Sequence, residues 1–293
     1  MSAAEIPMKT YFPRSVLENL QKYGLTAEGG PAVVGIKISG KCLDDFTTCC
    51  NIVRQVLELR LMGTNVVIVH GGGKQITAEC KKEGIEKREL HGLRVTSQRE
   101  MDIMKRCVPE LTNMLIKAFE TVAKDLQLKS IPVIGLNGYD GGIVKGELHS
   151  AEFEGSRTGK VVSVNGAALT ALMNSHVVVL NSLGDNWNFN ADDVFAAVCG
   201  ATNASLGVVC SDTALYNKRG QTIRHLFTDQ VAKLYQNGTF NSVIKPKVDA
   251  AVQMADTVCP VVIVKGMDHS AIERELYTKK GGGTRIDRRL EAA

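Results

Sequence analysis

Long apolar runs are absent from this 293-residue sequence. A helix needs about 20 consecutive apolar residues to cross a bilayer, and no stretch approaches that length. The first thirty residues also lack the apolar core of a secretory signal peptide, and Glu5, Glu18 and Glu28 are unusual in a mitochondrial transit peptide. We therefore expect a cytoplasmic protein with no membrane partner, with the mitochondrial matrix as the alternative.

Metal-binding patterns of cysteine are absent as well. None of the eight cysteines forms a C-x-x-C pair or stands at ligand spacing from a histidine, and most lie in apolar runs. We expect buried free thiols, a reducing compartment and no metal held by the protein itself. The formal charge is only +4, with lysines interspersed among acids, so the sequence offers no basic stripe for nucleic acid.

Three common signatures of catalytic loops are missing. Every Gly-Lys pair is followed by a residue other than Ser or Thr, which excludes a P-loop. The glycine-rich strand ends lack the G-x-G-x-x-G spacing of a dinucleotide site, and G-x-S-x-G does not occur. The chain is therefore not expected to be a P-loop enzyme, a Rossmann dehydrogenase or an α/β-hydrolase.

The sequence does contain two β-branched runs that end in glycines. Residues 33–40 read VVGIKISG and residues 66–74 read VVIVHGGGK, and a helix-period stretch follows each. Glycines let backbone N–H groups converge on an anion, and a helix start adds the positive end of its dipole. Because Lys37 adds a cation, these two corners favour phosphate binding. The alternative is that the glycines serve only tight turns.

Strand and helix patterns alternate along the chain. Apolar strands are expected near residues 33–38, 66–69, 131–134, 176–180, 206–210 and 261–264, with helices between them. The longest helical pattern covers about Gln98 to Asp125, and residues 143–165 alternate enough for a β-ribbon beside the cleft. This order predicts an α/β fold with an open, mainly parallel central sheet sandwiched by helices, and with ligands above the carboxyl ends of the strands.

The sequence predicts two further helices. A helix is expected from about Asp44, with Asp44 as its cap and Phe46 on its inner face. Residues 1–30 are expected to form an extension with one helix from about Ser15 to Tyr23.

Seven short motifs follow one another in a fixed order. They are Lys37-x-x-Gly40, His70-Gly71-Gly72-Gly73, Gly92-Leu93-Arg94-Val95-Thr96, Asn188-x-Asn190-Ala191-Asp192, Ser211-Asp212, Pro246-Lys247-Val248 and Gly281-x-Gly283-Thr284. This set resembles the amino-acid kinase family, and within it the N-acetylglutamate kinases, over about residues 33–286. The resemblance implies two lobes that share a continuous sheet, with residues 31–203 as the amino-acid-substrate lobe and residues 204–293 as the nucleotide-binding lobe.

The resemblance also implies a reaction. ATP would phosphorylate the side-chain carboxylate of N-acetyl-L-glutamate to an acyl phosphate, a step of arginine and ornithine biosynthesis, with Mg²⁺ held mainly by the phosphates of ATP. Two unit charges of like sign 4 Å apart repel by about 4 kcal/mol in a protein cleft, so the reaction needs cations and aligned amides. It needs no general base, because the acceptor carboxylate is already ionised. His70 is therefore expected to stabilise its turn by hydrogen bonding.

Roles for single residues follow from the resemblance. Lys37 and Lys247 are expected to grip the transferring phosphoryl group from opposite sides, with Asp192 holding both lysines in place. The residues expected to bind the amino-acid substrate are Gly71, Gly72, Arg94 and Asn188. Those expected to bind phosphate or nucleotide are Gly40, Gly73 and Asp212. Arg94 would pair with a substrate carboxylate through the two-point geometry of its guanidinium. Taken singly, each residue could instead be a helix-start acid or a surface ion-pair partner.

Two alternative functions stay open. One is a sister kinase acting on acetylaminoadipate or aspartate, and the other is a non-catalytic sensor of arginine or nucleotide on a kinase fold. Ser39 motivates the second, because it stands where this family usually has glycine and would be strained at positive φ. The retention of Lys37, Lys247 and Asp192 argues against it.

The extension over residues 1–30 suggests assembly and regulation. It resembles the N-terminal helix of arginine-inhibited relatives, in which such helices interlace two subunits. The resemblance implies a homodimer or a dimer-based hexamer and an arginine effector site that includes Glu275, Gly281 and Gly283.

Overall fold

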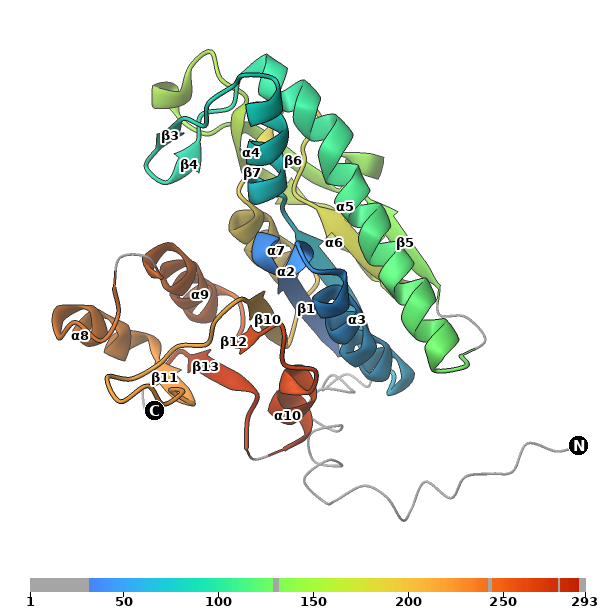
Figure 1. Cartoon of the computed structure of the whole chain (residues 1–293), viewed down its shortest axis with the longest axis vertical. Coiled ribbons are helices and arrows are strands. Elements are labelled where there is room, and N and C mark those ends of the chain that lie inside the picture. Colours follow the sequence, from blue (N-terminus) through green and yellow to red (C-terminus); the bar gives the residue numbers. More distant parts are fainter. Residues whose placement is uncertain (1–31, 129–131, 242–243, 279, 290–293) are drawn as a thin grey trace, which may run out of the picture.

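An eight-stranded sheet forms the centre of the computed structural model, which describes residues 32–128, 132–241, 244–278 and 280–289. The strand order is β11-β13-β12-β10-β1-β2-β8-β5 (Figure 1). Each neighbouring pair is parallel except β12 and β13, which are antiparallel. The predicted α/β fold with a mainly parallel sheet is therefore confirmed. The helix predicted for residues 15–23 lies outside the described residues.

Every strand that the sequence predicts is present within two residues of its expected bounds. The strands of the central sheet are β1 (Val33–Ile38), β2 (Asn65–His70), β5 (Val133–Leu136), β8 (Val177–Asn181), β10 (Leu206–Ser211), β11 (His225–Phe227), β12 (Val261–Lys265) and β13 (Gly283–Asp287). The sequence did not predict β11 and β13. β11 is only three residues long, and β13 contains Arg285 and Asp287, so neither has the apolar run from which the other strands were inferred.

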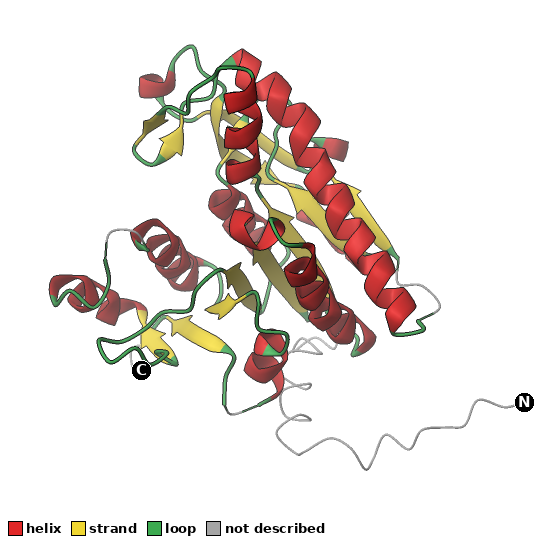
Figure 2. Ribbon diagram, viewed as in Figure 1, coloured by secondary structure: helices red, strands yellow, loops and turns green. Residues whose placement is uncertain are grey.

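Helices cover both faces of this sheet (Figure 2). They are α2 (Gly40–Leu43), α3 (Phe46–Leu61), α4 (Gly73–Lys82), α5 (Gln98–Asp125), α6 (Gly166–Met173), α7 (Ala191–Ala201), α8 (Val231–Gln236), α9 (Lys245–Thr257) and α10 (Ala271–Tyr277). The long helix α5 has the predicted bounds, and Ser97 and Glu100 form a capping box at its start. Among the described residues, no helix has the length and apolar character to cross a membrane.

The core has two layers, one on each side of the sheet. Val34, Ile36 and Ile38 of β1 pack with α3, α5 and α10 on one side. Val67 and Val69 of β2 pack with α6, α7 and α9 on the other side. Side chains of successive strand residues point to opposite faces, so a strand buried on both faces is apolar throughout. This explains why continuous β-branched runs predicted the inner strands correctly.

The start of α3 differs from the prediction. Asp45, not Asp44, caps the helix, because its side chain accepts hydrogen bonds from the backbone N–H groups of Thr47 and Thr48. The short helix α2 occupies residues up to Leu43, so the chain turns one residue later than the apolar pattern indicated. Asp44 instead forms an ion pair with Lys74. Phe46 is 36% exposed, so it does not belong to the inner face.

Two smaller sheets lie beside α4 at one end of the molecule (Figure 1). The strands β6 (Val144–Leu148) and β7 (Thr158–Val164) pair in antiparallel fashion, which confirms the predicted ribbon, and β9 (Asn188–Phe189) adds to β7. The second is a hairpin of β3 (Glu89–Leu90) and β4 (Leu93–Arg94). The turns η1 (Asp140–Gly142), η2 (Ala151–Phe153) and η3 (Thr228–Gln230) are 3-10 helices.

Candidate active site

The two glycine corners lie side by side. β1 and β2 are parallel neighbours, and Ile38 at the end of β1 pairs with His70 at the end of β2. Gly40 is the first residue of α2, and Gly72 is the N-cap of α4. Ser39 has φ −72° and ψ 153°, an extended conformation that any residue adopts. The strain considered for this serine is therefore absent.

Close packing explains one of these glycines. A Cβ on Gly72 would lie 3.0 Å from Cδ1 of Leu111 and 3.3 Å from Cγ2 of Val108, both on α5. A Cβ on Gly73 would have no atom within 4 Å. Gly72 is thus needed for the approach of α5, whereas the space beside Gly73 is open to a ligand.

Lys37 and Asp192 form an ion pair at the centre of the strand ends. Lys37 comes from β1, and Asp192 lies in the first turn of α7, which the Asn190 side chain caps. The two side chains are 12% and 27% exposed, so the pair is only partly screened by solvent. The structure brings this pair together as the sequence led us to expect.

Lys247 has different partners from those expected. It lies in the first turn of α9, donates a hydrogen bond to Oγ of Ser211, and is 3.4 Å from Oδ1 of Asp212. Among the described residues, Asp192 pairs with Lys37 and Asp212 pairs with Lys247, and a contact of Asp192 with Lys247 stays a prediction. Each lysine has its own carboxylate, since each approaches the cleft above a different strand. Lys37 belongs to β1, and Ser211 ends the neighbouring strand β10.

Asp212 is held in its charged form. Burial opposes its ionisation, but the hydrogen bond from Lys41 and the positive charge of Lys247 outweigh burial and lower its pKa from 3.8 to about 2. Lys41 lies 2.6 Å from Asp212, and the sequence analysis did not identify it. The lysine-rich side of the cleft therefore contains a permanent anion at neutral pH.

A cavity of about 320 Å³ lies next to these pairs. Six predicted residues line it, namely Gly71, Gly72, Gly73, Arg94, Asn188 and Asp192. Lys37 lies next to the cavity, because its ion-pair partner Asp192 is in the wall. Pro246, which precedes Lys247 in the sequence, is also in the wall. Gly40 and Asp212 lie at the strand ends outside the lining. The size and polar lining suit a small charged metabolite.

Arg94 and Asn188 are both held by neighbours. The Arg94 side chain is 7% exposed, and it donates from Nη1 to Glu100 and from Nη2 to the Gly73 carbonyl and the Thr77 hydroxyl. Asn188 donates from Nδ2 to Oγ1 of Thr96 at 2.9 Å. Their orientation is thus fixed before any ligand binds.

His70 is fully buried beneath the second corner. Its Nδ1 is 2.9 Å from the Gly71 carbonyl oxygen, and its Nε2 is 2.9 Å from Oγ1 of Thr112. Burial lowers its pKa to about 4, so the ring is neutral at physiological pH. These contacts agree with the expectation that His70 stabilises its turn.

The three residues proposed for an effector site lie close together. The carboxylate of Glu275 accepts a hydrogen bond from the Gly282 N–H at 3.0 Å, and its other oxygen is 3.8 Å from Arg285. Gly281 has φ +66°, and Gly283 begins β13 beside it. Glu275 is only 6% exposed. Arginine binding there stays a prediction.

The sequence analysis missed Lys87 and Glu89, which line the cavity from the β3–β4 hairpin. They stand in a charged stretch that reads as a solvated loop. The hairpin pairs Glu89 with Arg94, and this pairing brings the charged stretch to the cavity. Gly92, two residues before Arg94, is the one signal of a turn there.

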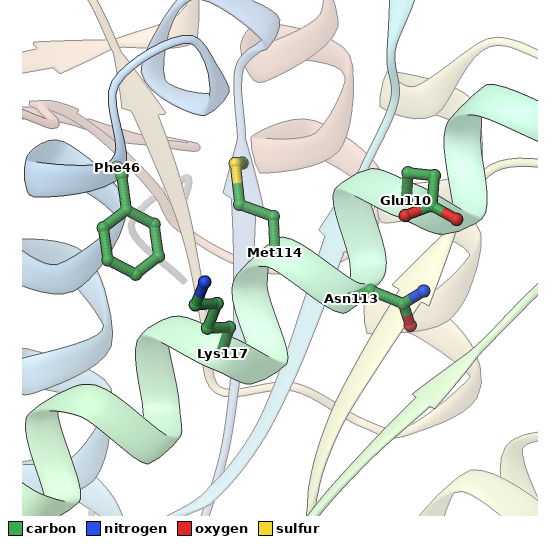
Figure 3. Close-up of a pocket in the computed structure, with 5 residues that line it drawn as sticks. All are labelled: Phe46, Glu110, Asn113, Met114 and Lys117. Atoms are coloured by element: carbon green, nitrogen blue, oxygen red, sulfur yellow. The ribbon is translucent and has the colours of Figure 1, made fainter.

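A second hollow, of about 360 Å³, lies between the start of α3 and the surface of α5 (Figure 3). Phe46 lines one side, and Glu110, Asn113, Met114 and Lys117 of α5 line the other. No predicted site residue is among them, so we assign the site to the strand ends.

The described residues contain neither a cluster of metal-ligating side chains nor a disulfide. Within residues 32–128, 132–241, 244–278 and 280–289, no three His, Cys, Asp or Glu side chains gather as a metal site would require. All eight cysteines are free, and six of them are buried.

Glycine corners and two lysine–carboxylate pairs above a mainly parallel sheet define an α/β protein suited to binding and transferring phosphoryl groups. Comparison with protein families agrees, because the model of the amino acid kinase family matches residues 33–265. The chain belongs to the amino acid kinase family, as its ordered motifs indicated.

Curated relatives cover most of the chain. An acetylglutamate kinase of Bartonella quintana is 30% identical over 294 residues, which cover 94% of this chain and 94% of that protein. An acetylglutamate kinase of a Sulfurihydrogenibium species is 29% identical over 273 residues, which cover 86% of this chain and 90% of that protein.

Solved structures share the fold. An N-acetylglutamate synthase of Neisseria gonorrhoeae, complexed with coenzyme A and L-arginine, superimposes with a TM-score of 0.81 at 17% identity. The match covers 94% of this chain but only 65% of that synthase. A carbamate kinase of Giardia superimposes with a TM-score of 0.63 at 13% identity, over 88% of this chain and 99% of that one.

Proposed function

We propose that this protein transfers the γ-phosphoryl group of ATP to the side-chain carboxylate of N-acetyl-L-glutamate, which yields an acyl phosphate. The observation that supports this most directly is the pairing of Lys37 with Asp192 and of Lys247 with Asp212 at neighbouring strand ends, beside a cavity that contains Arg94. The family and the names of the curated relatives point to the same reaction.

Charge neutralisation is the main task of the protein in this reaction. Lys37 and Lys247 would contact the transferring phosphoryl group, and their paired carboxylates hold the two ammonium groups in place. The backbone N–H groups of Gly40 and Gly73, at the starts of α2 and α4, would face the oxygens of that phosphoryl group. Because the acceptor is already a carboxylate, no side chain must remove a proton.

A magnesium ion would neutralise the phosphates of ATP. The described residues offer no group of three metal-ligating side chains, so ATP oxygens would supply most of the ligands. Asp212, which stays ionised above a pKa of about 2, is the carboxylate of this region that fits such a cation.

The acceptor would occupy the cavity of about 320 Å³. Arg94 and Asn188 lie in its wall and would contact the carboxylate that does not react. Gly71 and Gly72 would present backbone N–H groups to the side-chain carboxylate that accepts the phosphoryl group. This orientation would direct the side-chain carboxylate towards Lys37 and Asp192.

The test is an assay of ADP release with N-acetylglutamate, N-acetylaminoadipate and aspartate as acceptors. Hydroxylamine traps an acyl phosphate as a hydroxamate, so the product can be identified independently of ADP. We expect both signals to be largest with N-acetylglutamate. A larger signal with another acid would favour a sister kinase, and background signals with all three would contradict the proposed reaction.

We further propose a dimer-based assembly that responds to arginine. The support is the resemblance of residues 1–30 to an interlacing helix and the proximity of Glu275 to the glycine segment before β13. Light scattering and activity with and without arginine should be compared between the full chain and a variant that begins at residue 26. Equal size and equal arginine response in both would contradict this part.

A further inference from the structure

Both Nη atoms of Arg94 already have hydrogen-bond acceptors within the protein. A guanidinium binds a carboxylate at two points through Nη2 together with either Nη1 or Nε. Nη2 donates to the Gly73 carbonyl and the Thr77 hydroxyl, which are themselves joined by a hydrogen bond of 2.7 Å. Nη1 also donates to Glu100. A two-point bond from Arg94 to a ligand would therefore compete with contacts that Arg94 already makes within the protein.

A second cation lies in the wall of the same cavity. Lys87 lines it together with Glu89, with which it forms an ion pair. Glu89 is the cross-strand partner of Arg94 in the β3–β4 hairpin, so all three charged residues lie along one wall. The side chains of Lys87 and Glu89 are 40% and 46% exposed, which places their charges at the rim.

We propose that Lys87 binds the non-reacting carboxylate of the substrate and adds a second cation to Arg94, whose Nη atoms already have partners in the protein. This inference rests on the proposed function. It makes Lys87 a specificity residue that favours acceptors with a second carboxylate. Its partner Glu89 keeps the ammonium group at the rim until the substrate replaces or shares that contact.

An ordinary surface ion pair would look similar, because exposed pairs contribute little to stability. The chain offers such a pair as a matched control. Lys82 and Glu79 on α4 are 2.6 Å apart, exposed, and outside the cavity lining. Removal of Lys87 should therefore weaken substrate binding, whereas removal of Lys82 should leave substrate binding unchanged.

The first experiment compares the kinetics of Lys87→Met and Lys82→Met. We expect Lys87→Met to raise KM for N-acetylglutamate about tenfold, with kcat changed less than about threefold, as for a lost charge-assisted hydrogen bond at a partly exposed site. Lys87→Arg should restore most of the affinity. An unchanged KM in Lys87→Met would overturn the inference.

A second comparison separates lost attraction from new repulsion. Lys87→Met leaves Glu89 unpaired in the wall, where it would repel any anion. The double variant Lys87→Met/Glu89→Gln removes that charge, and we expect its KM to stay several times that of the wild type. Full recovery would mean that Lys87 only neutralises Glu89, which contradicts direct binding.

A substrate analogue identifies the carboxylate concerned. N-acetyl-L-isoglutamine keeps the acceptor carboxylate and replaces the other one with an amide. The KM ratio of Lys87→Met to wild type should be several times smaller with this analogue than with N-acetylglutamate. Equal ratios would overturn the assignment.

Failure of the proposed function can be recognised separately. If the wild type releases no ADP with any acceptor, the reaction is wrong, and calorimetric binding of N-acetylglutamate then tests Lys87 alone. A weaker Kd in Lys87→Met supports the contact. Equal Kd values, or no binding by the wild type, would overturn it.

Discussion

At the scale of single residues, charge pairs decide what the strand ends can do. Lys37 and Lys247 are each held by a carboxylate, although the two carboxylates come from different segments. The sequence predicted which residues meet at the cleft, because motifs at the ends of parallel strands converge. The sequence could not predict which acid pairs with which lysine, since the pairing changes when a helix shifts by a few ångströms.

Removal of Lys37 tests this arrangement. We expect Lys37→Ala to lower kcat at least a hundredfold, because one cation that stabilises the transition state is lost. The fold should persist, since the Asp192 side chain is 27% exposed and can be solvated. ADP-release assays and circular dichroism would measure the two effects, with Lys82→Ala as the control. Wild-type turnover in Lys37→Ala would exclude its assigned role.

His70 should make stability depend on pH. Its pKa falls from 6.5 to about 4 on burial, so the unfolded chain binds a proton more readily than the folded one. The contribution is fully present above pH 6.5 and is lost as the pH falls towards 4, by about 3 kcal/mol. Urea unfolding at several pH values should show this slope, and His70→Gln should reduce it. Equal slopes in the two proteins would contradict the prediction.

At the scale of elements, the strands buried on both faces were predictable and the boundaries were less so. Continuous β-branched runs indicated β2, β8 and β12. The three-residue strand β11 and the strand β13, which carries two charged residues, gave no comparable signal, because their pairing depends on neighbours distant in the sequence. The predicted cap of α3 was wrong by one residue, since Asp44 and Asp45 are equally good caps on propensity alone.

The cap of α3 can be tested by substitution. We expect Asp45→Ala to lower the free energy of unfolding by about 1 kcal/mol, because two backbone N–H groups at the helix start lose their acceptor. Asp44→Ala should cost less, about 0.5 kcal/mol or below, because it breaks an exposed ion pair with Lys74 and an exposed hydrogen bond from Gln75. Urea denaturation measures both. A larger loss of unfolding free energy in Asp44→Ala than in Asp45→Ala would show that Asp44 is the cap.

The second glycine corner offers another matched pair. We expect Gly72→Ala to destabilise the protein by about 1 to 2 kcal/mol, because its new methyl group would press against Leu111 and Val108. Gly73→Ala should leave stability almost unchanged, since nothing lies within 4 Å. Thermal unfolding of the two variants measures the difference. Equal effects would show that α5 adjusts to the added methyl group.

At the scale of the whole molecule, the cleft depends on segments from both halves of the chain. Arg94 and the glycine corners come before residue 203, whereas Ser211, Asp212 and Lys247 come after it. The division into two lobes at this point, which the family resemblance implies, stays a prediction. The sequence could not predict the cavity wall formed by β3–β4, because that hairpin has only two residues in each strand.

The adjacency of β1 and β10 has a consequence for how the polypeptide can be divided. Their residues are paired although Val34 and Leu206 are 172 positions apart, and both strands are buried. A polypeptide cut after Asn203 would give two fragments, each with an unsatisfied row of amides and carbonyls along an apolar border. Each fragment should aggregate when it is expressed alone. Co-expressed, the two pieces should recombine through that border and regain turnover, so the gene could be split into a complementing pair.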